Sequence, residues 1–387
     1  MLRREPQSLA FLPTRLASPD TLATVPFTVV IAPDSFKGSL SARQVAGAIA
    51  DGWISVRPDD VLLLVPQADG GEGTLDAVEA AVPGSLRRTA GTVTGPDARP
   101  TPGEWLELPG KVAVIELAQA SGLPLMRELD ATGATTRGLG EVIRSAIESG
   151  ATSLVIGLGG SASTDGGAGA LTALGMLFID EQGELIADGG LALRDIVTID
   201  RSDCVAAPSG GVILLTDVTA PLVGPTGAAA VFGPQKGATP AQVAQLDASL
   251  SHFADLLGGR RTAPGAGAAG GTAYGLATAW NATITSGADY LAELTGLNTA
   301  IGSADVLVTG EGRFDHQSLT GKVVGQLLDV AAAARVTAGV IAGQVTADSN
   351  VWTVALSDLA GSVEGAMSDT ARWLRAAGAK AARELPR

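Results

Sequence analysis

The sequence predicts an α/β protein with two domains, in which a parallel sheet is interrupted by an inserted second α/β domain. Short runs of branched apolar residues recur, each ends in a stretch rich in glycine and charge, and a helical pattern follows each time. Such runs are typical of buried parallel strands joined by helices. The rhythm is clearest near both ends of the chain, and the middle departs from it.

Length and composition set limits on the class of protein. At about 150 residues per domain, 387 residues predict two or three domains, and 46% hydrophobic residues suffice for their cores. The net charge of −14 disfavours nucleic acid and anionic membrane surfaces as partners, so an anionic substrate would need a local basic pocket. No apolar run approaches the ~20 residues that span a bilayer. The single cysteine, Cys204, cannot form an internal disulfide, which fits the cytoplasm.

The first 26 residues have neither a sustained apolar core nor helical periodicity. We expect a disordered extension or an upstream start. A transit peptide is the alternative, which Glu5 and Asp20 disfavour.

The opening of the chain predicts two strand–loop–helix units. Residues 28–32 form a short β-branched run, and Ser41 with Gln44 makes a capping-box pattern that begins a helix. A second strand at 61–65 precedes a glycine-rich loop and then a helical face with Leu75, Val78 and Val82. Two βαβ-type units would thus be complete before residue 88.

The middle of the chain predicts a different architecture. Turn signals at 95–97 and 109–110 separate short stretches at 105–108 and 112–117, which indicates antiparallel hairpins. A helix at 139–147, strands at 154–156 and 212–215, and a helix at 242–257 follow.

The end of the chain shows the same alternation of strands and helices as its beginning. We predict strands at 306–309, 339–342 and 352–356 and a helix at 323–333. The economical topology joins both chain ends in one sheet. We therefore expect one domain from 27–88 plus 286–387 and an inserted domain at 89–285, with a cleft between them.

The loops after the predicted strands carry the chemistry, because ligands of open α/β sheets bind beyond the carboxyl ends of the strands. Lys37 and Lys322 lie at helix starts, which favour anions, although solvated surface lysines are the alternative. Six carboxylates sit at or just past strand ends, and on one cleft they would repel each other unless a cation such as Mg²⁺ lay between them. They are Asp34, Asp69, Asp165, Asp217, Glu311 and Asp315. Each alone could be a turn or capping residue.

Common motifs are missing. Thr320-Gly321-Lys322 is followed by Val323, so no P-loop exists, and the glycines of 265–270 follow Pro264 rather than a strand. The only histidines are His252 and His316, which makes a serine–histidine triad or a histidine metal site a poor explanation.

Long strings of the chain are similar to the bacterial glycerate kinase family, which includes the glycerate 2-kinases. The matching segments are 31–42, 68–74, 157–169, 232–238, 264–271 and 309–323, in the order of the family, and the resemblance covers 28 to about 380. It implies ATP-dependent phosphorylation of D-glycerate with Mg²⁺, on a flavodoxin-like domain interrupted by a second α/β domain of restriction-enzyme-like topology. The chain departs from the family pattern at Ser163-Thr164, Ala220, Gln67 and Val324.

The resemblance and the chemistry of phosphoryl transfer together suggest roles. Lys37, Lys236 and Lys322 would neutralise phosphate oxygens, and Arg313 would hold the glycerate carboxylate. Asp69 and Asp217 would hold Mg²⁺, and Asp165 or Asp315 would accept the hydroxyl proton. The remaining expected nucleotide-binding residues are Asp34, Gly70, Gly71, Gly159, Gly160, Ser161 and Glu311.

Three alternatives stay open at this point. The product could be 3-phosphoglycerate, another small hydroxy acid could be the acceptor, or the protein could bind a nucleotide or organic acid without catalysis. We expect a monomer or a small homo-oligomer.

Overall fold

The computed structural model describes residues 26–36, 38–316, 318–319 and 323–385. Two predicted phosphate-binding residues, Lys37 and Lys322, lie outside the described residues. The predicted disordered extension over 1–26 also lies outside them, apart from Pro26.

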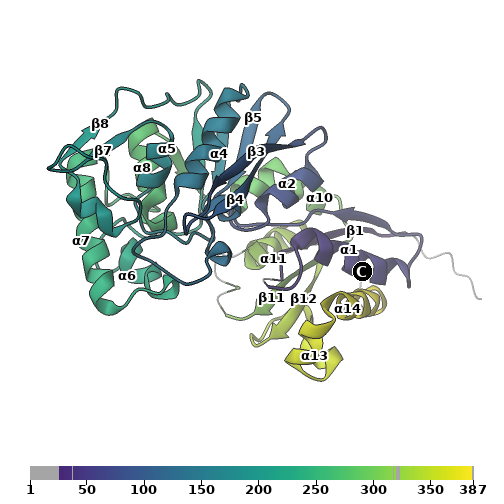
Figure 1. The fold of residues 1–387 in the computed structure, drawn as a ribbon. Coiled ribbons are helices and arrows are strands. Elements are labelled where there is room, and N and C mark those ends of the chain that lie inside the picture. The colour runs from purple at the N-terminus through teal and green to yellow at the C-terminus, as the bar shows by residue number, and fades with distance from the viewer. Residues whose placement is uncertain (1–25, 37, 317, 320–322, 386–387) are drawn as a thin grey trace, which may run out of the picture.

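The first sheet is parallel and joins the two ends of the chain (Figure 1). Its order is β13-β12-β11-β1-β2, which in chain order within this sheet is 2-1-3-4-5, the order of flavodoxin. Ile31 pairs with Leu64 on one side and with Val308 on the other. The strands are β1 (Thr28–Pro33), β2 (Val61–Leu64), β11 (Val306–Phe314), β12 (Thr337–Val345) and β13 (Trp352–Ala355).

The second sheet is mixed and comes from the middle of the chain, in the order β10-β9-β6-β5-β4-β3. Its first four strands in that order are parallel, and β3, β4 and β5 form the two predicted antiparallel hairpins. The strands are β3 (Leu86–Thr94), β4 (Pro100–Leu108), β5 (Val112–Glu116), β6 (Ser153–Gly157), β9 (Val212–Leu215) and β10 (Thr283–Thr285). A separate antiparallel pair consists of β7 (Leu177–Ile179) and β8 (Thr198–Asp200).

Helices cover both faces of the first sheet, because neighbouring residues of a buried strand point to opposite faces. Val29 and Ile31 pack on one face with α1 (Ala42–Ile54), α12 (Leu356–Ala360), α13 (Val363–Ser368) and α14 (Thr370–Glu384). Val30 and Ala32 pack on the other with α9 (Gly287–Leu294), α10 (Leu297–Gly302) and α11 (Val323–Ala334). The predicted capping box of Ser41 and Gln44 is present at the start of α1.

The largest core lies on one face of the second sheet. The helices that contribute to it are α3 (Leu117–Ser121), α4 (Arg137–Glu148), α5 (Ala168–Ala173), α6 (Ala228–Phe232), α7 (Pro240–Leu257) and α8 (Thr272–Trp280). Short 3-10 turns lie at Leu123–Leu125, Leu191–Asp195, Pro234–Lys236 and Ala268–Gly271.

The helix α2 (Thr74–Ala81) crosses from the first sheet to the second. Its Leu75 and Val78 pack with Leu106 of β4 and Val155 of β6, on the face opposite the largest core. The strand that follows, β3, also belongs to the second sheet. The prediction of two complete βαβ units before residue 88 is therefore wrong, since only β1, α1 and β2 make such a unit.

The strand β11 is longer than predicted. We expected the strand to end at Thr309, but β11 stays paired with β12 as far as Phe314, opposite Val345. A Cβ atom at Gly310 would lie 2.1 Å from the carbonyl oxygen of Ile341. Glycine is thus needed here for the close approach of a neighbouring strand, rather than for a turn.

In the part of the chain that the structure describes, no helix is both long enough and apolar enough to cross a bilayer.

Candidate active site

Two glycine loops, one from each sheet, touch where their strands end. The amide of Gly159, just after β6, donates a hydrogen bond to the carbonyl oxygen of Gly70 over 3.0 Å. A Cβ atom at Gly157 would lie 2.4 Å from the same oxygen, and one at Gly159 would lie 2.5 Å from the Cα of Gly71. Side chains at these positions would push the backbones apart, so the glycines permit the contact. The loops at 68–74 and 157–161, which we expected to line one cleft together with the other strand-end loops, are thus in contact.

Asp69 and Asp217 both lie near this contact and are connected through Gly287. Asp217 Oδ1 accepts hydrogen bonds from Ser286 Oγ (2.9 Å) and the amide of Gly287 (3.0 Å). A Cβ atom at Gly287 would in turn lie 2.2 Å from the carbonyl oxygen of Asp69. Asp69 Oδ1 accepts from the amide of Gly71 over 3.0 Å.

The electrostatics of this pair indicate a place for a cation. Burial raises the pKa of the Asp217 carboxyl, and the negative charge of Asp69 raises it further. Two carboxylates that repel each other are stabilised by a cation between them. Among the described residues no group of three or more His, Cys, Asp or Glu could hold a metal. Two carboxylates nevertheless fit Mg²⁺, which proteins usually bind through one or two carboxylates together with substrate phosphates and water.

A second group lies beneath the loop after β6. Lys236, 2% exposed, donates from Nζ to Ser161 Oγ (2.9 Å) and to the carbonyl oxygen of Ser163 (2.5 Å). Burial lowers the pKa of Lys236 to about 8, and the charge of Asp165 opposes this shift. At neutral pH the lysine therefore carries a buried positive charge, held by Ser161 at the end of the glycine loop.

Asp165 is fully buried and turned inward. Its Oδ2 accepts from the amide and hydroxyl of Thr136 (both 2.8 Å) and from the amide of Gly169 (3.3 Å), while Oδ1 accepts from the amide of Gly167 (3.1 Å). Burial raises the pKa of Asp165, and these hydrogen bonds lower it. The carboxylate ties the start of α5, whose N-cap residue is Gly167, to Thr136 before α4, which is a structural role.

A third group lies at the carboxyl end of β11. The Arg313 side chain is 63% exposed, and its Nε lies 3.6 Å from Asp315 Oδ2. Nearby, the amide of Asp34 donates to the carbonyl oxygen of Gly310 over 2.8 Å, and Glu311 stands opposite Ala342 of β12. Among the described residues, the ion pair of Arg313 is with Asp315, and no ion pair joins this arginine to Asp69 or Asp217.

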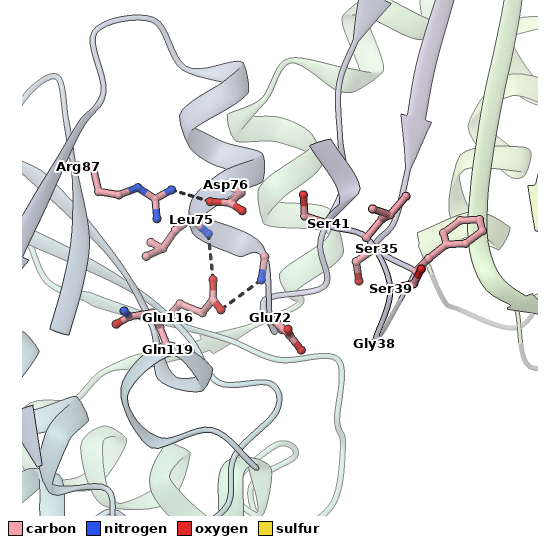
Figure 2. A pocket seen from close by; sticks show the side chains of 13 residues that line it. Ser35, Gly38, Ser39, Ser41, Glu72, Leu75, Asp76, Arg87, Glu116 and Gln119 are labelled. Carbon is pink, nitrogen blue, oxygen red and sulfur yellow. Dashed lines mark hydrogen bonds and ion pairs between the residues drawn. The ribbon is translucent and has the colours of Figure 1, made fainter. Parts of the chain in front are cut away.

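A cavity of about 420 Å³ opens between the two sheets (Figure 2). The loop after β1 lines one side with Ser35, Ser39 and Ser41. The other side consists of Glu72 and Asp76 around the start of α2, Arg87 of β3, and Glu116 and Gln119 around the end of β5. Arg87 is engaged by three carboxylates, those of Asp76 (2.7 Å), Glu79 (2.7 Å) and Glu104 (3.4 Å).

Sequence reasoning missed Glu116. It is the last residue of β5, 6% exposed, and its carboxylate accepts hydrogen bonds from the start of α2. The available signal was an acidic residue between the apolar run 112–115 and a helix, the same arrangement that marked the other candidate carboxylates.

The fold and this site define a two-lobed α/β protein with an acidic and glycine-rich centre between its sheets. The profile of the glycerate kinase family matches residues 29–386. Glycerate 2-kinase of Escherichia coli (strain K12) is 42% identical over 338 residues, which cover 84% of this chain and 87% of that protein. Glycerate kinase of Bacillus subtilis (strain 168) is 42% identical, covering 83% and 86%.

A solved structure is similar as well. The crystal structure of putative glycerate kinase 2 from Salmonella typhimurium LT2 superposes with a TM-score of 0.74 at 34% identity, covering 93% of this chain and 100% of that one. The chain belongs to the glycerate kinase family.

Proposed function

We propose that this protein transfers the terminal phosphoryl group of ATP to D-glycerate and that the product is 2-phosphoglycerate. Membership of the glycerate kinase family supports this activity, and the similarity to the Escherichia coli glycerate 2-kinase supports the position of transfer. The observation that carries the proposal is the contact of the two glycine loops beside Asp69 and Asp217, because phosphoryl transfer requires positioning and charge neutralisation.

The groups around that contact would bind the nucleotide. Asp69 and Asp217 would hold Mg²⁺, which when bound supplies positive charge to the phosphate oxygens. The backbone at Gly70, Gly71, Gly159 and Gly160 leaves room for phosphates to approach. Lys236 would add positive charge through Ser161, and Lys37 and Lys322 are proposed as further phosphate-binding residues; Asp34 and Glu311 complete the proposed nucleotide-binding set.

The carboxyl end of β11 would bind the acid. Arg313 is exposed, and its planar guanidinium suits a carboxylate in a bidentate manner. Asp315 is the better of the two proposed bases, because Asp165 is buried and both its oxygens already accept hydrogen bonds. Asp165 would instead fix α5 and support the charge of Lys236.

We further propose that the chain works as two domains that close on the substrates, since exclusion of water protects ATP from hydrolysis. The domains would be built on the two sheets. Because α2 packs on the second sheet, the proposed first boundary between the domains moves from residue 88 to the loop at 69–73. The restriction-enzyme-like topology of the second domain remains a proposal from the family resemblance. The cytoplasm is the proposed location, because a single cysteine fits a reducing compartment.

Phosphorus NMR of the reaction with ATP, Mg²⁺ and D-glycerate tests the activity and the position of transfer together. We expect stoichiometric ADP and the resonance of 2-phosphoglycerate. A 3-phosphoglycerate resonance would contradict the position of transfer. Absence of any phosphorylated acid, with binding of nucleotide retained, would contradict the proposed enzyme and favour a binding protein.

A further inference from the structure

Glu116 connects the second sheet to the loop that follows β2. Its Oε1 accepts from the amide of Gly73 over 3.2 Å, and its Oε2 accepts from the amide of Leu75 over 3.1 Å. Figure 2 shows this carboxylate pointing at the first turn of α2, with one oxygen directed to each amide. Both oxygens of one buried side chain thus satisfy amides that a helix start leaves without partners.

The start of α2 needs an acceptor from elsewhere in the chain. Its N-cap residue is Gly73, with φ 90° and no side-chain hydrogen bond to the helix. Within the loop, Asp69 Oδ1 accepts from the amide of Gly71, and Thr74 Oγ1 donates to the carbonyl oxygen of Gly71 over 2.7 Å. Glycine backbone is costly to order, so an anchor at the end of this loop restricts where its other residues lie.

We infer that Glu116 is a positioning residue: its ionised carboxylate fixes the end of the loop at 69–73 and thereby places Asp69, Gly70 and Gly71 for Mg²⁺ and nucleotide. This inference rests on the proposed function of that loop. Glu116 itself has no assigned contact with substrate, so it acts through the loop.

The surroundings of Glu116 make this anchor dependent on pH. Burial raises the pKa of Glu116 to about 7, and the negative charges of Asp76 on α2 and Glu72 in the loop raise it further, while the amides of Leu75 and Gly73 lower it. The cation of the cavity wall, Arg87 of β3, is engaged by Asp76, Glu79 and Glu104. Gln119 on α3 is neutral. Protonation turns one oxygen of Glu116 into a hydroxyl, which is a weaker acceptor for the amide it faces.

The main test compares Glu116→Gln with the wild type from pH 6 to pH 8.5, with kcat and the KM for Mg·ATP measured separately. Glutamine has one oxygen and one NH2 group where glutamate has two oxygens. The NH2 group cannot accept a hydrogen bond from the backbone amide that it faces, so one hydrogen bond is lost. Above pH 8 we expect the KM for Mg·ATP to rise about tenfold in the variant, on the order of one lost hydrogen bond to a charged group. In the wild type the same KM should rise as the pH falls through about 7, and this rise should be absent from the variant. A change near pH 8 from Lys236, whose pKa is about 8, would be common to both proteins.

Two further measurements keep the inference falsifiable. Asp76→Asn removes a charge that raises the pKa of Glu116, so the midpoint of the wild-type pH profile should move to lower pH. Should Glu116→Gln fail to fold, hydrogen exchange of the wild-type protein gives the answer: protection of the amides of Gly73 and Leu75, corrected for intrinsic rates, should fall below pH 7.

The inference is overturned if Glu116→Gln keeps the wild-type pH profile, or if protection of those two amides does not change across pH 7. Failure of the proposed function would look different. If the loop at 69–73 does not bind Mg²⁺, Asp69→Asn would leave the Mg²⁺ requirement unchanged at every pH, whatever the behaviour of Glu116→Gln.

Discussion

At the scale of single residues, the structure distinguishes carboxylates that face the site from one that supports it. The charge of Asp69 raises the pKa of the half-buried Asp217 carboxyl, whereas Asp165 is enclosed by amides and a hydroxyl. The sequence could predict that Asp69 and Asp217 both lie past strand ends on the expected cleft, because ligands of open α/β sheets bind beyond the carboxyl ends of the strands. It could not predict the burial of Asp165 or the contact of Glu116, since both depend on where α4, α5 and α2 pack.

Replacing Asp217 tests the proposed metal site. Asp217→Asn keeps the volume and can still accept from Ser286 and Gly287, but it removes a negative charge from the pair. We expect the Mg²⁺ concentration for half-maximal activity to rise about tenfold or more, as is typical when one carboxylate ligand is lost. Asp289→Asn is the matched control, because among the described residues the side chain of this nearby aspartate forms no hydrogen bond or ion pair with Asp69 or Asp217. An unchanged Mg²⁺ requirement in Asp217→Asn would contradict the site.

Lys236 provides a test of buried charge through stability. Burial lowers its pKa to about 8 in the folded protein from an ordinary value of 10.5. Between these pH values the unfolded state binds more protons, so the free energy of unfolding rises with pH. Relative to Lys236→Met, the wild type should gain up to about 3 kcal/mol between pH 8 and pH 10.5. Urea denaturation of both proteins at the two pH values measures this gain. A difference that stays constant or decreases would show that the lysine is not desolvated.

At the scale of elements, glycine allows neighbouring helices and strands to pack with their backbones in close contact. The helices α1 and α14 cross at a reciprocal contact: a Cβ atom at Gly52 would lie 2.0 Å from the carbonyl oxygen of Arg375, and one at Gly378 would lie 2.2 Å from that of Ile49. The sequence predicted α1 well because its capping box and apolar spacing agree. The prediction for β11 ended too early, because the glycines that allow two strands to approach closely cannot be distinguished in the sequence from the glycines of a loop.

The crossing of α1 and α14 yields a stability prediction. In Gly378→Ala the new methyl group meets backbone that cannot move without shifting a helix, so we expect a loss of about 1–3 kcal/mol in the free energy of unfolding. Gly47→Ala in α1 is the control, since nothing lies within 4 Å of its added Cβ; alanine there should stabilise the helix by up to about 1 kcal/mol. Chemical denaturation measures both. Equal effects of the two substitutions would refute the packing argument.

At the scale of the whole molecule, the candidate site depends on a contact between loops that follow strands of two different sheets. Figure 1 shows the two sheets in separate lobes of the molecule. The repeated strand–loop–helix rhythm predicted that both chain ends share a sheet. It did not show that α2 packs on the second sheet, because the sequence of an amphipathic helix does not indicate which apolar surface the helix will cover.

The contact between the sheets can be disturbed directly. Gly157→Ala would place a methyl group 2.4 Å from the carbonyl oxygen of Gly70 and force the two glycine loops apart. We expect kcat/KM to fall by about 100-fold, since displacements near 1 Å have effects of that order, with secondary structure retained. Gly302→Ala, which meets nothing within 4 Å, should leave kcat/KM unchanged. Normal activity of Gly157→Ala would mean that the contact of the loops is not needed for catalysis.

The most direct test of the central claim is a crystal structure with Mg²⁺, a non-hydrolysable ATP analogue and D-glycerate. The account predicts the metal at Asp69 and Asp217, the phosphates along the glycine loops at 69–73 and 157–161, and the carboxylate of the acid at Arg313. A nucleotide bound on one lobe alone, with its metal away from both aspartates, would contradict it.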